Sequence, residues 1–73
     1  MARKVYRVVP AGERWELKHE GDVLAANDTK QPLVEQGQAT AKPNQPSQLV
    51  VHKKDGTIEY EYTYGDDPSE TKG

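Results

Sequence analysis

The spacing of apolar residues changes twice along this 73-residue chain, from every second residue to helical spacing and back. Over 4–10 we expect side chains that point alternately to two faces, Tyr6 and Val8 to one and Val5, Arg7 and Val9 to the other, and apolar and polar residues alternate over 14–19. A period of two places successive side chains on opposite faces of a β-strand. We therefore predict two strands that form an antiparallel hairpin across the turn at 11–13, and a short third strand over 23–26.

The central segment predicts a helix from Thr29 to Lys42. Thr29 is the expected N-cap, which places Pro32 at the third helical position, where a missing amide costs little. Pro43 and Pro46 are expected to end the helix. Gly37 weakens a helix by about 1 kcal/mol relative to alanine, and close packing of the helix on a sheet would explain it. The residues that recur on one helical face are Leu33, Val34, Gly37, Thr40 and Ala41.

The C-terminal part predicts a second hairpin. The apolar run at 49–51 indicates a central strand over 47–53. Asp55-Gly56 suits the positive φ angles of a tight turn, and strict alternation follows over 57–64. One face of this last strand is expected to carry Ile58, Tyr60, Tyr62 and Tyr64, and the other Thr57, Glu59, Glu61 and Thr63.

These elements together predict an α+β fold. The order is β-β-(β)-α-β-β, a small two-layer domain with a mostly antiparallel sheet and one helix on one face. We assign residues 1–64 to a single domain and 65–73 to a polar C-terminal tail. Trp15 is expected in the core with Leu17, Leu33 and Val51, because strand alternation points it inward.

Composition excludes several classes of protein. The chain has no cysteine and only two histidines, which excludes disulfides and makes a buried metal site improbable. No stretch reaches the roughly 18 consecutive apolar residues of a membrane span, and the N-terminus lacks the apolar segment of a signal peptide. We therefore expect a cytoplasmic protein that has no contact with membranes. The net charge of −2 argues mildly against a dedicated nucleic-acid binder.

Several motifs resemble a known family. They are Tyr6-Arg7-Val8-Val9-Pro10, Trp15 on an alternating strand, Thr29-Lys30 at a helix start, Val-His-x-x-Asp-Gly-x-Ile at 51–58 and Tyr-Gly-x-Asp-Pro at 64–68. Together they resemble domain-of-unknown-function family 2188, a set of small bacterial and phage proteins. The chain departs from the family pattern in its helix, with Pro32 in place of a glutamate, and Leu33 and Gly37 in place of alanines. The resemblance implies a fold and a cellular setting, and it implies no activity.

Possible catalytic groups have simpler explanations. Glu59 and Glu61, on one strand face, would lie roughly 7 Å apart, a spacing that inverting glycosidases use. On a flat strand without a pocket they are expected to be solvated instead. His52 faces away from Leu49 and Val51 and has no evident nucleophile beside it. We therefore expect a protein that is not an enzyme, with no catalytic residues, no metal and no cofactor.

What remains is a binding role, with candidate residues on one sheet face and at the end of the last strand. They are Arg7, Arg14, Lys18, His52, Tyr62 and Tyr64. The leading hypothesis is a protein-interaction module with an unknown protein partner, which could be a second copy that binds through a sheet edge or an open face.

The alternative is a nucleic-acid binder that uses a sheet face, with basic residues on phosphates and tyrosines stacked on bases. The order of tryptophan-bearing hairpin, short strand and helix is similar to the arm-site DNA-binding domains of phage integrases. Against this, glutamates are expected on the same face as the basic residues, and the tyrosines are expected beneath the helix.

Overall fold

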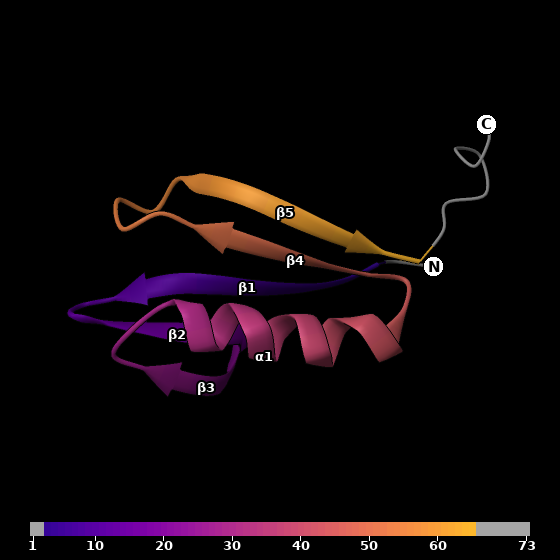
Figure 1. Cartoon of the computed structure of the whole chain (residues 1–73), viewed down its shortest axis with the longest axis horizontal. Coiled ribbons are helices and arrows are strands. Elements are labelled where there is room, and N and C mark those ends of the chain that lie inside the picture. Colours follow the sequence, from indigo (N-terminus) through magenta and orange to yellow (C-terminus); the bar gives the residue numbers. More distant parts are fainter. Residues whose placement is uncertain (1–2, 66–73) are drawn as a thin grey trace.

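A computed structural model of the chain describes residues 3–65, which form five strands and one α-helix (Figure 1). The elements are β1 (Lys4–Ala11), β2 (Arg14–His19), β3 (Asp22–Asn27), α1 (Gln31–Ala41), the 3₁₀ helix η1 (Lys42–Asn44), β4 (Ser47–His52) and β5 (Ile58–Tyr64). The predicted α+β order is confirmed, and the third strand is six residues long. Beyond Gly65, the predicted tail lies outside the described residues. The α-helix within residues 3–65 is not long and apolar enough to cross a bilayer.

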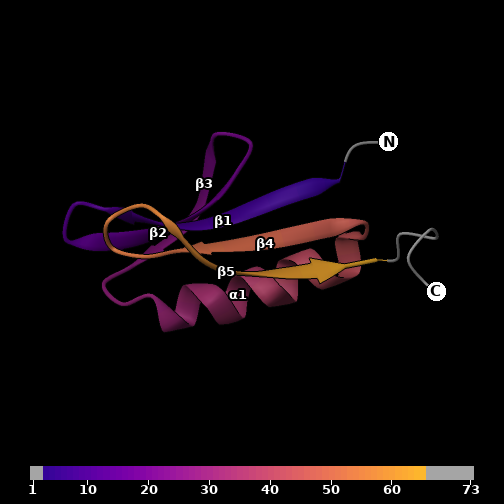
Figure 2. The same ribbon diagram turned by 90° about the horizontal axis from the view of Figure 1, so that it is seen from above.

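The strands form one sheet in the order β3-β2-β1-β4-β5. All neighbours are antiparallel except β1 and β4, which are parallel. Pro10 lies inside β1 opposite Trp15 of β2, whereas the pairing of β1 with β4 ends at Val8. The proline is tolerated because no β4 residue is paired with β1 at that position. Figure 2, which turns the molecule by 90°, shows α1 on one side of the sheet and the β2–β3 turn on the other.

The core lies between α1 and the middle strands. The helix packs chiefly on β1, β4, β2 and β3, while β5 extends beyond it. Gly37 brings the two layers together, because a Cβ atom there would lie 2.7 Å from Leu49 Cδ1 and 3.2 Å from Leu17 Cδ1. This confirms close packing as the reason for the glycine. The buried cluster is Tyr6, Val8, Leu17, Leu33, Val34, Ala41, Leu49 and Val51.

The helix begins one residue later than predicted, and the assignment of Thr29 as N-cap is wrong. Lys30 occupies the cap position with helical angles and makes no side-chain cap hydrogen bond. With Thr29 as the cap, Pro32 would be the third helical residue and would have no N–H to donate to the hydroxyl, which leaves only the N–H of Gln31. The Thr29 hydroxyl instead accepts a hydrogen bond from Asn27 Nδ2 at 3.1 Å.

The β4–β5 hairpin is confirmed, with a longer turn than a two-residue one. The backbone N–H of Lys53 donates to the carbonyl of Thr57 at 2.7 Å, and that of Gly56 donates to Lys53 at 2.9 Å. Three residues, 54–56, therefore connect Lys53 to Thr57. Among them, Gly56 has a positive φ of 94°.

A β-bulge between Val51 and His52 contradicts the predicted faces of β5. Tyr60 lies opposite Val51, but Ile58 lies opposite His52, so Glu59 is the extra residue. Ile58 therefore faces away from α1, with His52, and not in line with the tyrosines. Glu59 instead pairs with Lys30 at the start of α1, so it does not share a face with Glu61.

Trp15 lies at the border of the core. It is partly buried and packs against the cluster that includes Leu17, Leu33 and Val51. The ammonium group of Lys30 lies over its ring, 5.0 Å from the ring centre. The indole therefore packs on the core with one side and on a lysine with the other.

We predict that Gly37→Ala destabilises the domain by about 1 kcal/mol. The gain in helix propensity is about 1 kcal/mol, whereas overpacking a core typically costs about 1–3 kcal/mol. Leu49 is fully buried, so it cannot move away from the new methyl group without disturbing its neighbours. Chemical denaturation measures the change. Gln36→Ala, at an exposed position of the same helix, is the control, and equal stability of both variants would contradict the close-packing argument.

Candidate interaction surface

The face of the sheet turned away from α1, here called the open face, has no helix over it among residues 3–65 (Figure 2). Strand alternation and the observed register decide which side chains it carries. They are Val5, Arg7, Val9, Arg14, Glu16, Lys18, Val23, Ala26, Gln48, Val50, His52, Ile58, Glu61 and Thr63.

The open face is partly apolar. Ile58 is 52% exposed and Val23 is 51% exposed, which is high for large aliphatic side chains. Val5 and Val9 are half-buried. Val50 is buried without help from α1, and Arg7 lies directly across from it on β1. Such a surface offers apolar contact area on several strands.

His52 is held by two hydrogen bonds on this face. Its Nδ1 lies 2.8 Å from the Gly56 carbonyl oxygen, which can only accept, so Nδ1 carries the proton. Its Nε2 therefore accepts from Arg7 Nη1 at 3.2 Å. The imidazole fixes the direction of the Arg7 side chain and has no ring nitrogen left for a substrate.

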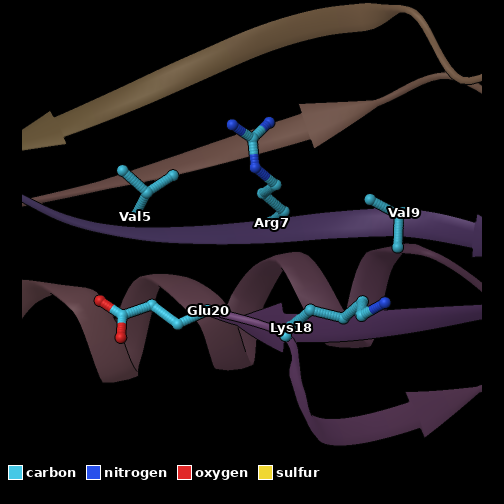
Figure 3. Close-up of a pocket in the computed structure, with 6 residues that line it drawn as sticks. Val5, Arg7, Val9, Lys18 and Glu20 are labelled. Carbon is cyan, nitrogen blue, oxygen red and sulfur yellow. The ribbon is translucent and has the colours of Figure 1, made fainter.

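A shallow hollow of about 320 Å³ crosses β1 and the end of β2 on the open face (Figure 3). Its apolar part comes from Val5 and Val9, and the β2–β3 turn contributes Glu20 and Gly21. The register places Arg7 directly opposite Lys18. Like charges at opposed positions repel, and Figure 3 shows the two head groups extending away from each other. Among residues 3–65, neither cation forms an ion pair.

The predicted binding residues do not all come together. Arg7, Lys18 and His52 share the open face, as does Arg14, which forms an ion pair with Asp28 at 3.2 Å. Tyr62 and Tyr64 lie on the opposite side of the sheet, beside α1. A nucleic-acid strand could not contact the basic residues and these tyrosines on one face.

A second hollow, of about 530 Å³, lies between α1 and β5. Its lining residues are Gln38, Ala39, Lys42, Tyr62 and Tyr64. Tyr62 and Tyr64 also pack against the core as partly buried residues, and Tyr60 meets Tyr62 edge-on with ring centres 5.4 Å apart. Partial desolvation, and then the neighbouring Tyr62, raises the pKa of the Tyr60 phenol above its ordinary value of 10.0. The tyrosines therefore cover the edge of the core and leave a groove beside the helix.

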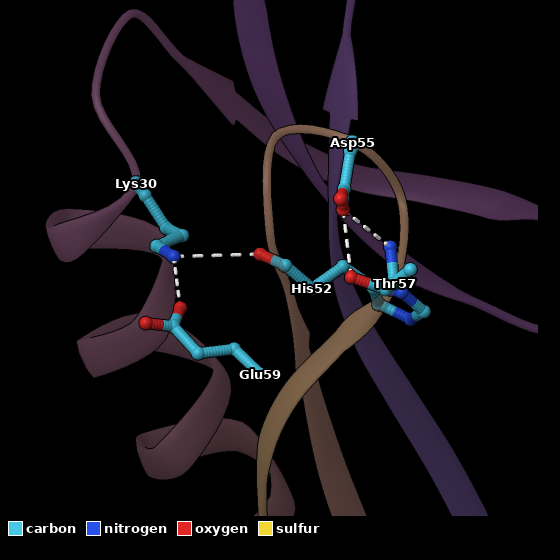
Figure 4. A network of polar contacts seen from close by, with 5 residues as sticks. All are labelled: Lys30, His52, Asp55, Thr57 and Glu59. Atoms are coloured by element: carbon cyan, nitrogen blue, oxygen red, sulfur yellow. Dashed lines mark hydrogen bonds and ion pairs between the residues drawn. The ribbon is translucent and has the colours of Figure 1, made fainter.

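Lys30 is the residue whose importance sequence reasoning missed. Its Nζ donates to the His52 carbonyl at 3.4 Å and pairs with Glu59 (Figure 4). The same Nζ lies over the ring of Trp15. A lysine at a helix N-terminus is disfavoured by the helix dipole, and the Glu59 carboxylate offsets that cost. The Thr-Lys helix start was a visible signal, but the bulge that turns Glu59 toward it was not.

The β4–β5 turn is closed by Asp55. This carboxylate accepts from the Thr57 hydroxyl at 2.7 Å and from the Thr57 backbone N–H at 3.0 Å (Figure 4). These hydrogen bonds, the hydroxyl's first, hold the pKa of Asp55 below its ordinary value of 3.8. Because the Asp55 carboxylate is bonded to Thr57, it stabilises the turn and does not orient the His52 imidazole.

In the part of the chain that the structure describes, no group of side chains is arranged to bind a metal ion or to act as a pair of catalytic carboxylates. No three histidine or acidic side chains of residues 3–65 gather where they could hold a metal ion. Glu59 is engaged with Lys30, and Glu61 accepts a hydrogen bond from Gln48 on the open face. The two glutamates are therefore not a pair of carboxylates that flank one site.

The sequence matches a protein-family model described as "Uncharacterized protein conserved in bacteria (DUF2188)" over residues 6–64. The chain belongs to this family. The DUF2188 match runs from Tyr6 in β1 to Tyr64 at the end of β5, so it includes the second hollow, all of the first hollow except Val5, and the Lys30 contacts. No curated protein and no solved structure matches the chain.

We predict that Thr57→Val raises the pKa of Asp55 toward 3.8, because it removes the hydroxyl and keeps the backbone N–H. A carboxylate with a lowered pKa in the folded state adds stability above its unfolded pKa, and this stability is lost as pH falls. The wild-type domain should therefore lose more stability than the variant as pH falls below about 3.8. NMR titration of the carboxyl carbon measures the pKa, and Thr63→Val, the same change away from Asp55, should leave it unaltered.

Proposed function

We propose that this domain is a non-catalytic module that binds another protein through its open face. The observation that carries the proposal is the open face, with exposed Ile58 and Val23 and with Arg7 and Lys18, which form no ion pair within residues 3–65. Protein interfaces combine apolar contacts with a few oriented charged groups in this way.

The distribution of charge favours a protein partner over a nucleic acid. Glu16 and Glu61 lie among the basic residues of the open face, and Glu20 borders the hollow. Arg14 already pairs with Asp28. Non-specific affinity for nucleic acid grows with the number of phosphates neutralised, and these carboxylates would repel a phosphate backbone.

The contacts of the candidate catalytic groups support a non-catalytic role. Both nitrogens of His52 are engaged, with Gly56 and Arg7. A general base needs a free nitrogen or carboxylate within reach of a substrate proton, and Glu59 is engaged with Lys30.

A binding titration with oligonucleotides distinguishes the proposed function from the alternative, nucleic-acid binding. We expect no dissociation constant below about 1 μM for single- or double-stranded oligonucleotides near 150 mM salt, measured by fluorescence anisotropy. Tighter binding that weakens steeply with added salt would support the nucleic-acid alternative. Arg7 and Lys18 would then be the residues whose substitution reduces the salt dependence.

Capture of partners from a lysate of the source organism tests the open face directly. Wild-type protein should retain a partner that Lys18→Glu and Ile58→Ser lose, in quantitative mass spectrometry. Lys42→Glu is the matched control, because it makes the same charge change at an exposed position on α1's side of the sheet. Equal recovery with all variants would contradict a partner site on the open face.

A further inference from the structure

The outer edge of β5 ends the sheet. β5 pairs with β4 on one side, and no strand among residues 3–65 pairs with it on the other. An edge strand presents a row of free backbone N–H and C=O groups, which is a template for another strand. Figure 1 shows β5 as the uppermost strand, beyond the area that α1 covers.

This edge lacks the features that keep sheet edges from pairing. Proteins protect edges with prolines, lysines, bulges and charged side chains. The segment 60–64, Tyr-Glu-Tyr-Thr-Tyr, contains no proline and no lysine, and the bulge precedes it. The nearby charged groups are tied to their own domain, Glu59 to Lys30 and Glu61 to Gln48. At its C-terminal end the Tyr64 carbonyl accepts from Arg3 Nη1 at 3.4 Å, and the rest of the edge over 60–63 is regular.

We propose that β5 binds β5 of a second copy in antiparallel orientation, with Tyr62 opposite its own counterpart on a twofold axis. The two sheets would then join into one, with both helices on the same face. This inference does not rest on the open-face proposal, because it uses another surface and another kind of contact.

Charge, the bulge and the extent of pairing select this register among those that keep the faces aligned. With Tyr62 at the axis, Glu61 faces Thr63 of the partner subunit, and no like charges are opposed. A shift that centres Glu61 places it against its own counterpart, and opposed like charges destabilise a strand pair. A shift that centres Tyr60 brings the bulge residue Glu59 into the pairing, where it would interrupt the ladder. A shift that centres Thr63 opposes no like charges, but it pairs only residues 62–64 of β5.

The helix side of the edge suits the same register. Tyr60 faces Tyr64 of the partner subunit, and aromatic cross-strand pairs are favourable. The hollow lined by Tyr62, Tyr64 and Lys42 lies beside this position and leaves room for the partner's ring. Because the dimer is twofold symmetric, the contact between Tyr60 and Tyr64 occurs twice in it.

Opposite charge changes at one exposed residue test the proposal by analytical ultracentrifugation. The wild-type chain should show a monomer–dimer equilibrium at concentrations up to about 1 mM. Thr63→Glu places two glutamates against Glu61 residues and should weaken the dimer roughly 2- to 30-fold, whereas Thr63→Lys should strengthen it over a similar range. The difference should shrink in high salt. Circular dichroism shows that both variants fold, as expected at an exposed position.

A wild-type chain that stays monomeric throughout this range would overturn the proposal. So would a shift of both Thr63 variants in the same direction, because the register requires opposite signs.

The absence of cysteine from the chain allows a second test of the register. Directly opposed residues in an antiparallel pair have Cβ atoms about 4.5–5.5 Å apart, close enough for a disulfide after a small adjustment. A mixture of Glu61→Cys and Thr63→Cys chains should therefore oxidise mainly to the mixed dimer. Preferential crosslinking of Glu61→Cys with itself would show the Glu61-centred register and overturn the one proposed.

Discussion

One helix is too narrow to cover a sheet of five strands. An α-helix with its side chains is about 10 Å across, and neighbouring strands are about 4.8 Å apart, so α1 can shield little more than two strands at a time. It packs over the middle of the sheet, where β1 and β4 supply Val8, Leu49 and Val51. As a direct result, no element among residues 3–65 covers the opposite face of the sheet or the outer edge of β5. Both surfaces to which we assign binding follow from this mismatch of widths.

A small core has to be fixed at several points, and α1 is held along its length. At its start, Lys30 joins Glu59 and Trp15. In its middle, Gly37 lets the helix backbone approach Leu49 and Leu17. At its end, the fully buried Ser47 hydroxyl donates to the Ala41 carbonyl, which has no partner within the helix. These contacts define where the helix lies, which apolar packing alone would leave free to slide.

Periodicity predicted the elements and most of their faces. The switch from strand to helix spacing is a local property of the sequence, so the five strands and the helix could be assigned without knowledge of the sheet order. The faces of Ile58 and Glu59 could not, because a bulge depends on pairing between strands and reverses the alternation on one side of it. The open-face cluster of Arg7, Lys18 and His52 was foreseeable from alternation. Its separation from Tyr62 and Tyr64 also follows from alternation, because the two tyrosines lie opposite Leu49 and Ser47 on the helix side of the sheet.

Because α1 lies on a single side of the sheet, the domain can bind a target made of repeated identical subunits more tightly than it binds one subunit. If two copies join through β5, their open faces lie side by side on one extended sheet, and the helices stay out of the way. Two weak sites that are rigidly connected then act by avidity, since the first contact raises the effective concentration of the second. An array of identical protein subunits would be bound far more tightly than a single subunit of the same kind.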